Sequence, residues 1–311
     1  MLPYFNYKSI TDLNDLIVKS LYKIPHDVDL IVGIPRSGML PANLIALYLN
    51  KPYTDIDSFV DERIYDFGER GKSLNTKKID KILLIDDSIC SGNALNKVKQ
   101  KIKQKKLSSN ILFGSIYATP ESANKVDIFF EIVEMPRVFQ WNLFHHNDVI
   151  PHSFMDIDGV LCPNPPVDDD GPIYKEYIAN APLLFRPSVE IDTIISCRLE
   201  KYRLITESWL QTNEIKYKKL IMLDMQNKID RIKWGKHGAY KGNAYKNSDA
   251  ILFIESSWIE AKTIFKISKK PVFCVETFSM INHRKLKIRL NLFFEKIKVI
   301  VWKILCKCGI I

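Results

Sequence analysis

The sequence predicts an α/β protein of two domains, each a doubly wound parallel sheet, followed by a C-terminal amphipathic helix. Short apolar runs alternate with helical patterns in the first half of the chain, and the alternation resumes in the second half after a polar stretch. The chain has 311 residues, of which 46% are hydrophobic, which is enough for a core in each half.

In the first half, apolar runs separated by helical segments indicate βαβ units. The expected strands are residues 29–34, 81–87, 111–118 and 127–134. The expected helices are residues 41–50 and 93–105. Ligands of such sheets bind at the carboxyl ends of the strands, so the polar residues at those ends are candidates for a site.

A polar, proline-containing stretch at residues 145–153 precedes a new apolar strand. It predicts domains at residues 1–148 and 149–281, with residues 282–311 as a separate tail. The expected strands of the second domain are residues 154–161, 193–197, 220–223, 251–256 and 271–275. The expected helices are residues 200–213, a segment from about residue 225, and residues 258–268.

Composition excludes several classes of protein. No basic segment followed by a long apolar run opens the chain, so we expect no secretory signal and a cytoplasmic location. The six cysteines lack paired or zinc-type spacing, which favours reduced thiols. Residues 282–311 carry a net charge of +7 out of the chain's +9, so the rest of the chain carries only +2. This distribution argues against a nucleic-acid-binding core.

Two acids, Asp86 and Asp87, end the apolar strand of residues 81–87, and a small polar loop and a helix follow them. Backbone N–H groups at a helix N-terminus bind phosphate, and adjacent carboxylates can accept hydrogen bonds from a vicinal diol. Together they suit a ribose 5-phosphate. On this pattern alone, a solvated turn is an equally good interpretation.

Residues 83–95, LLIDDSICSGNAL, resemble the phosphoribosyl pyrophosphate motif of type I phosphoribosyltransferases, with Asn93-Ala94 in place of the family's glycine-threonine ending. Residues 33–38 resemble the family's pyrophosphate loop. The resemblance implies the type I fold. The phosphoribosyl pyrophosphate-binding residues that it implies are Arg36, Ser37, Gly38, Asp86, Asp87, Ser88, Cys90, Ser91, Gly92, Asn93 and Ala94.

Residues 61–78, with Arg63, Arg70 and Lys72, correspond by position to the family's flexible loop, although a solvated hairpin fits them equally well. Trp141 lies where some members of the family carry an aromatic residue. The implied reaction is substitution at the anomeric carbon, with Mg²⁺, Arg36 and backbone donors stabilising the charge on the departing diphosphate.

Asp156 and Asp158 follow a second apolar strand, and Gly159 comes next. Residues i and i+2 of an extended chain point to the same side, so we expect both carboxylates in one pocket. Paired carboxylates at this spacing suit a nucleophile and an acid/base. The glycine allows the chain to turn after them.

The segment Asp156 to Leu161 resembles motif one, D-x-D-G-x-L, of the haloacid dehalogenase-like (HAD) phosphatases, and implies their Rossmannoid fold. By this resemblance Asp156 is the nucleophile and Asp158 the acid/base. Further implied residues are Ser196 for phosphate binding, Lys241 as the cation with Lys236 as its rival, and Asp156, Asp158 and Glu255 as Mg²⁺ ligands. The short segments between the motifs leave little room for a large cap domain, so we expect an open site that accepts a bulky substrate.

The tail combines basic residues with apolar residues at a spacing of three to four, for example Leu286, Leu290 and Phe293. This pattern predicts an amphipathic helix at an anionic membrane surface, because no uncharged run is long enough to span a bilayer. A terminal helix packed on the domain or in a homodimer is the alternative.

The combination resembles the two-component ribofuranosyltransferases of bacterial surface polysaccharides such as O-antigen and capsule. In that family a phosphoribosyltransferase adds ribose 5-phosphate to a lipid-linked glycan, and a phosphatase removes the 5-phosphate. This predicts a bifunctional enzyme at the inner face of the cytoplasmic membrane. Two alternatives remain: nucleobase phosphoribosyl transfer coupled to a nucleotidase, and a phosphoribosyl pyrophosphate sensor that regulates a phosphatase.

Overall fold

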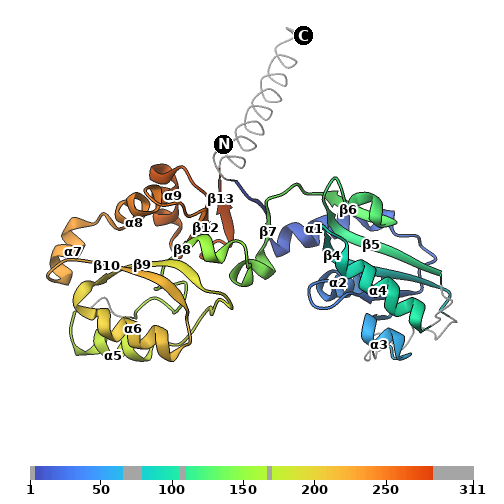
Figure 1. Cartoon of the computed structure of the whole chain (residues 1–311), viewed down its shortest axis with the longest axis horizontal. Coiled ribbons are helices and arrows are strands. Elements are labelled where there is room, and N and C mark those ends of the chain that lie inside the picture. The colour runs from blue at the N-terminus through green and yellow to red at the C-terminus, as the bar shows by residue number, and fades with distance from the viewer. Residues whose placement is uncertain (1–3, 66–78, 106–109, 167–169, 283–311) are drawn as a thin grey trace, which may run out of the picture. The chain divides into compact units, whose positions relative to one another are not determined.

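The computed structural model describes residues 4–65, 79–105, 110–166 and 170–282, which divide into two compact units (Figure 1). The N-terminal unit is Asn6–Trp141, and the C-terminal unit contains residues 142–282 together with residues 4 and 5. The predicted amphipathic tail lies outside the described residues from residue 283 on, as do Arg70 and Lys72 of the predicted flexible loop.

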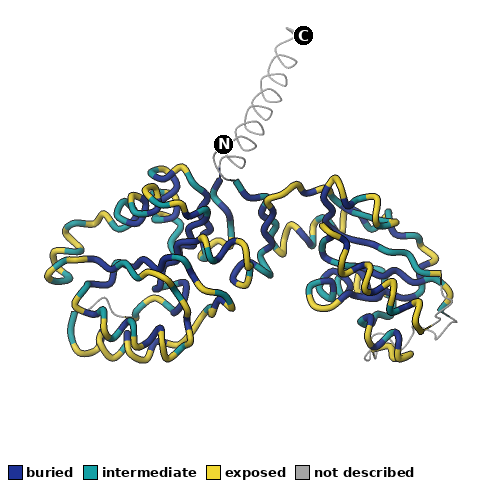
Figure 2. Tube along the Cα trace, viewed as in Figure 1, coloured by how far each residue is buried: buried dark blue, intermediate teal, exposed yellow. Residues whose placement is uncertain are grey.

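In the described part of the N-terminal unit, five strands form a sheet in which every pair is parallel. In spatial order they are β3 (Tyr53–Asp55), β2 (Leu30–Gly33), β4 (Lys81–Ile89), β5 (Asn110–Ala118) and β6 (Ile128–Ile132). The central strands are almost continuously apolar and buried, because helices cover both faces of the sheet (Figure 2).

Alternate residues of the central strands pack against different helices. The first face carries α1 (Ile10–Ser20) and α2 (Met39–Leu49), whose apolar side chains cluster with Ile31, Leu83 and Ile85. The opposite face carries α3 (Ile56–Val60) and α4 (Asn93–Gln104), which cluster with Leu30, Val32, Ile82 and Leu84. The unit is therefore doubly wound, as the sequence predicts.

Beside this sheet, β1 (Asn6–Lys8) pairs in parallel with β7 (Arg137–Phe139), which connects the beginning of the unit to its end. Helix α1 was not among the expected elements, although Ser9 and Asp12 form a capping box at its start. The short 3₁₀ helices are η1 (Leu21–Lys23), η3 (Ala123–Lys125), η4 (Gln140–His145), η5 (Ile150–His152) and η6 (Glu200–Tyr202).

The described part of the C-terminal unit contains a six-stranded sheet. Its spatial order is β10 (Tyr217–Leu223), β9 (Ile191–Leu199), β8 (Ser153–Met155), β11 (Leu252–Glu255), β12 (Val272–Cys274) and β13 (Ser279–Ile281). The prediction of a wholly parallel sheet is wrong at one edge, because β13 is antiparallel to β12. A tight turn joins these two strands, and a parallel pair would need a long crossover.

The helices of this unit are α5 (Pro172–Asn180), α6 (Arg203–Thr212), α7 (Lys228–Trp234), α8 (His237–Lys246) and α9 (Trp258–Ser268). Tyr245 of α8 and Ile264 of α9 share a buried cluster with Phe154 and Phe253 of the central strands. Helix α5 contributes to a separate cluster with the carboxyl ends of β9 and β10. The predicted helix at residues 258–268 is α9 with the same bounds.

None of the helices within the described residues combines the length and the apolar character needed to cross a membrane.

Candidate active sites

The first candidate site lies where β4 ends, between the neighbouring strands β2 and β5. The carboxylate of Asp87 is buried and accepts two side-chain hydrogen bonds. The Ser37 hydroxyl donates to Oδ1 at 2.9 Å, and the Trp141 indole Nε1 donates to Oδ2 at 2.7 Å. Residues from the loop after β2 and from the end of the unit therefore fix this carboxylate.

Asp86 has a different environment. Its Oδ1 accepts a hydrogen bond from the backbone N–H of Asp87 at 2.9 Å. Burial, and after it the charge of Asp87, raises the pKa of Asp86 to about 8. A Cβ on Gly38 would lie 2.9 Å from Asp86 Oδ1 and 2.5 Å from the Ile34 carbonyl oxygen, so this close approach of loop and acid requires glycine.

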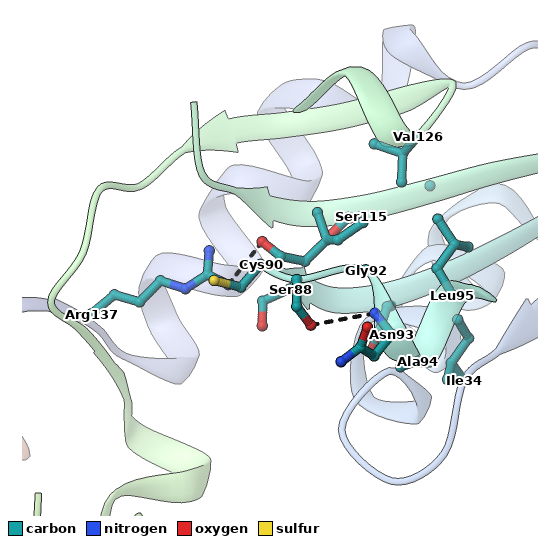
Figure 3. A pocket seen from close by; sticks show the side chains of 14 residues that line it. Ile34, Ser88, Cys90, Gly92, Asn93, Ala94, Leu95, Ser115, Val126 and Arg137 are labelled. Carbon is teal, nitrogen blue, oxygen red and sulfur yellow. Dashed lines mark hydrogen bonds between the residues drawn. The ribbon is translucent and has the colours of Figure 1, made fainter. Parts of the chain in front are cut away.

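A cavity of about 160 Å³ lies beside these acids, at the start of α4 (Figure 3). Gly92 precedes α4 with a φ of +83°, a left-handed conformation that favours glycine. The first N–H groups of a helix have no partners within the helix and attract anions. The lining residues are Ile34, Asp86, Ser88, Ile89, Cys90, Ser91, Gly92, Asn93, Ala94, Leu95, Gly114, Ser115, Val126 and Arg137.

The structure brings most of the predicted phosphoribosyl pyrophosphate-binding residues together. Asp86 and the loop from Ser88 to Ala94 line the cavity, Ser37 bonds Asp87, and Gly38 lies against Asp86. Arg36 is exposed and does not line the cavity. Arg63 lies 3.6 Å from Asp61 in an exposed ion pair and is not among the lining residues.

Sequence reasoning missed Arg137 and Ser115 as lining residues, and it gave Trp141 only a positional match. One signal for Arg137 was present in the sequence, where this charged residue lies between two apolar neighbours. That segment was not predicted to be a strand, so the signal was not used.

The model of the phosphoribosyl transferase domain family matches residues 6–146. Residues 6–146 form a phosphoribosyl transferase domain. Such a domain implies phosphoribosyl pyrophosphate as a substrate, and the acids and the loop described above belong to the matched segment.

Three solved structures to which the chain is similar are also phosphoribosyltransferases. The xanthine-guanine-hypoxanthine phosphoribosyltransferase of Helicobacter pylori is 17% identical over 45% of this chain and 94% of its own, with a TM-score of 0.33. A purine phosphoribosyltransferase from Pyrococcus horikoshii is 20% identical over 43% of this chain and 92% of its own, with a TM-score of 0.33. A hypoxanthine phosphoribosyltransferase of Staphylococcus aureus is 13% identical over 40% of this chain and 75% of its own, with a TM-score of 0.28. No curated protein matches the sequence.

The second candidate site lies outside the phosphoribosyl transferase domain, at the carboxyl ends of β8 and β11. Lys241 of α8 is buried among three carboxylates. Its Nζ lies 2.7 Å from Asp156 Oδ2, 2.9 Å from Glu255 Oε2 and 2.8 Å from Glu260 Oε2. Burial alone would lower the pKa of Lys241, but the surrounding carboxylates outweigh it and hold that pKa well above its usual value. The predicted rival, Lys236, is exposed at the N-cap of α8.

Asp158 faces a different cation. Arg198 of β9 donates from Nη2 to Asp158 Oδ1 at 2.7 Å and from Nε to Oδ2 at 3.0 Å, which is a bidentate pair. The Arg198 side chain is 0% exposed, while that of Asp158 is 20% exposed. Ser196, two residues earlier, is buried, and its hydroxyl accepts the Arg198 backbone N–H at 3.1 Å.

These groups line an open cavity of about 500 Å³. Its described lining is Asp156, Asp158, Asn164, Pro165, Tyr174, Ser196, Cys197, Arg231, His237, Lys241, Glu255, Ser256, Ser257, Glu260 and Glu276. Acidic side chains outnumber basic ones in this set, so the cavity favours a cation. The turn after the paired acids needs glycine, since a Cβ on Gly159, whose φ is +76°, would lie 2.5 Å from Ser256 Cβ.

The predicted Mg²⁺ ligands are not gathered around one point. Asp158 is paired with Arg198, and the ammonium of Lys241 lies between Asp156 and Glu255. Within the described part of the chain, no three His, Cys, Asp or Glu side chains are grouped so that they could hold a metal ion. The carboxylate oxygens nevertheless have the ligand chemistry that Mg²⁺ prefers.

Sequence reasoning missed Glu260 and Arg198 at this site. Glu260 lies in the first turn of α9, five residues after Glu255, and this position near a strand end was a usable signal. Arg198 is the penultimate residue of an apolar strand, and a charge in such a strand requires a partner. Nothing in the local pattern identified that partner.

Proposed function

We propose that this chain transfers a 5-phosphoribosyl group from phosphoribosyl pyrophosphate to a lipid-linked glycan and then removes the 5-phosphate, leaving ribofuranose. The observation that carries the proposal is the presence of two sites in one chain. A phosphoribosyl transferase domain is followed by a unit in which the D-x-D-G-x-L segment meets a buried lysine and two further acids.

In the transfer step, Asp86 and Asp87 accept hydrogen bonds from the ribose hydroxyls, and the loop from Ser88 to Ala94 binds the 5-phosphate. An acceptor hydroxyl forms the new bond to the anomeric carbon and passes its proton to the departing diphosphate, while the bond from that carbon to the diphosphate breaks. Arg36 and the backbone of residues 33–38 stabilise the departing diphosphate. Mg²⁺ would neutralise part of the charge of the diphosphate.

In the hydrolytic step, Asp156 attacks the 5-phosphate and forms an aspartyl phosphate, and Asp158 protonates the departing ribose oxygen. Asp158 then activates the water that releases phosphate. Lys241 holds Asp156 in position and offsets charge on the phosphate, and Ser196 binds a phosphate oxygen. For Mg²⁺ to supply further charge neutralisation through Asp156, Asp158 and Glu255, these carboxylates would first have to leave their ion pairs with Lys241 and Arg198.

A glycan acceptor is supported by the open cavity of about 500 Å³ in the C-terminal unit. The connections between its motifs are short, so a phosphate on a large product can enter. Attachment to the inner face of the membrane through residues 282–311 is part of the same proposal, and it rests on the basic, apolar pattern of the sequence.

Mass spectrometry of an acceptor panel tests the acceptor. The Asp156→Asn protein is incubated with phosphoribosyl pyrophosphate, Mg²⁺ and either oligosaccharides or purine and pyrimidine bases. We expect a phosphoribosyl adduct on a glycan. Nucleotide formation with no glycan adduct would replace this proposal with a salvage function, and ligand binding without pyrophosphate release would favour a sensor.

A further inference from the structure

Arg137 of β7 is a buried cation whose partners are incomplete. The residue is 7% exposed, and its Nη2 donates to the Ile89 carbonyl at 2.9 Å. Its Nη1 is buried and has no hydrogen-bond partner. Among the described residues, no carboxylate forms an ion pair with this guanidinium.

An unsatisfied buried donor is costly. Leaving such a group unpaired costs about 1–3 kcal/mol, and more for a charged group, so buried charges are normally paired. Arg137 does not pack in the interior of the core, because it lines the cavity of about 160 Å³ at the start of α4. Figure 3 shows its side chain extending from β7 toward Cys90 and Ser88. The missing partner is therefore expected from a ligand in that cavity.

Two independent features of the cavity select an anion. Gly92 and Asn93 place the N-terminus of α4 at one side, where backbone N–H groups are available. Arg137 supplies a guanidinium at another side, and it is the one cationic side chain among the described lining residues. The loop from Ser88 to Ala94 carries no basic side chain, so a charged donor must come from elsewhere in the fold.

Size and position distinguish the 5-phosphate from other groups of the donor. Ligand pockets usually measure about 300–1,000 Å³, so this cavity fits a phosphate group better than a whole sugar diphosphate. Of the predicted pyrophosphate loop, only Ile34 lines the cavity, whereas the loop after β4 lines it almost continuously.

We propose that Arg137 binds the 5-phosphate of the phosphoribosyl donor, acting together with the N-terminus of α4. The ligand class is a phosphate monoester, and Nη1 donates to one of its oxygens. This inference rests on the proposed binding of phosphoribosyl pyrophosphate. It adds a residue outside the loop to the recognition of that ligand, because a side chain from β7 completes the phosphate site.

Calorimetric titration of the full chain carrying Asp156→Asn, which should not hydrolyse ribose 5-phosphate, with three ligands tests the inference. Phosphoribosyl pyrophosphate and ribose 5-phosphate carry the 5-phosphate, and inorganic pyrophosphate does not. We expect Arg137→Met to weaken the binding of the first two ligands at least about tenfold, because one charge-assisted hydrogen bond is lost. The affinity for pyrophosphate should change less than about twofold. Arg137→Lys should retain part of the affinity, since it keeps the charge. Lys103→Met, which removes an exposed charge from α4, is the control and should bind all three ligands normally.

Thermal unfolding separates this role from a structural one. Because Nη1 lacks a partner without ligand, Arg137→Met should leave the melting temperature of the unligated protein unchanged or higher, and it should reduce the increase caused by ribose 5-phosphate. Equal weakening of all three ligands, or unchanged ribose 5-phosphate affinity with a higher acceptor KM, overturns the inference. If wild-type protein fails to bind phosphoribosyl pyrophosphate, the proposed function itself fails.

Discussion

The indole nitrogen of Trp141 donates a 2.7 Å hydrogen bond to the carboxylate of Asp87, although 54 residues separate them in the sequence. Trp141 also stacks on Phe139 with ring centroids 4.9 Å apart, and Phe139 stacks on Tyr117 at 5.3 Å. The aromatic stack thus fixes the indole, and the indole fixes the orientation of an acid that we assign to ribose binding.

Trp141→Phe should keep the stacking and lose the donor. We expect the Kd for phosphoribosyl pyrophosphate to rise about three- to tenfold, because a lost hydrogen bond to a charged group frees the Asp87 side chain. The melting temperature should fall by a few degrees, because a buried oxygen of Asp87 loses its donor. Tyr48→Phe removes an exposed hydrogen bond to Asn14 in the same unit and is the matched control. Equal affinities of the two variants would show that the Trp141 hydrogen bond has no role in binding.

Asp86 should make stability depend on pH. Its pKa is raised from 3.8 to about 8, so the folded protein keeps a proton that the unfolded chain releases. The contribution of Asp86 to stability is therefore complete below about pH 4 and is lost as the pH rises to about 8. Asp86→Asn should be more stable than wild type by about 5 kcal/mol at pH 8.5 and about equally stable near pH 4. Melting curves of the unligated proteins at both pH values check this, and a difference independent of pH would contradict it.

The loss of Asp158 should lower the free energy of unfolding more than the loss of its partner Arg198. Asp158→Ala leaves a fully buried guanidinium without its carboxylate and should cost about 3–5 kcal/mol. Arg198→Met leaves a partly exposed carboxylate that water can reach, so the cost should be smaller. Urea unfolding of both single variants and the double variant measures the two costs. The opposite ranking would show that Asp158 is not the partner on which Arg198 depends.

Lys241 and Lys236 should differ sharply in the hydrolytic step. Lys241→Met removes the cation among Asp156, Glu255 and Glu260, and it should lower phosphatase activity by about 10²-fold or more and reduce stability. Lys236→Met removes an exposed charge and should leave the activity within about twofold of wild type. Hydrolysis of ribose 5-phosphate by both variants measures this. An active Lys241→Met protein would exclude Lys241 from the reaction.

Local patterns were sufficient to predict much of the fold. The apolar run of β4, its two acids and the start of α4 could be read directly, because a buried parallel strand and a phosphate-type loop have strong sequence patterns. Helix α1 was missed even though its capping box, Ser9 and Asp12, is visible in the sequence. The antiparallel β13 was missed because a three-residue edge strand carries almost no periodic signal.

The partners of the site residues were harder to predict. Arg198 meets Asp158 across 40 residues, and Arg137 meets the Ile89 carbonyl across 48. Such pairings depend on strand order in the sheets, which a local pattern does not contain. The spacing of Asp156 and Asp158 predicted one shared pocket, and both do line one cavity. Their separate cations could be identified only from the fold.

Product masses from three proteins test the division of labour between the two sites most directly. Wild type, Asp156→Asn and Asp87→Asn are each incubated with phosphoribosyl pyrophosphate, Mg²⁺ and the glycan acceptor. We expect a ribosylated glycan from wild type, a phosphoribosylated glycan that accumulates with Asp156→Asn, and no adduct with Asp87→Asn, which still hydrolyses ribose 5-phosphate. Loss of both activities in both variants, or a dephosphorylated product from Asp156→Asn, would contradict it.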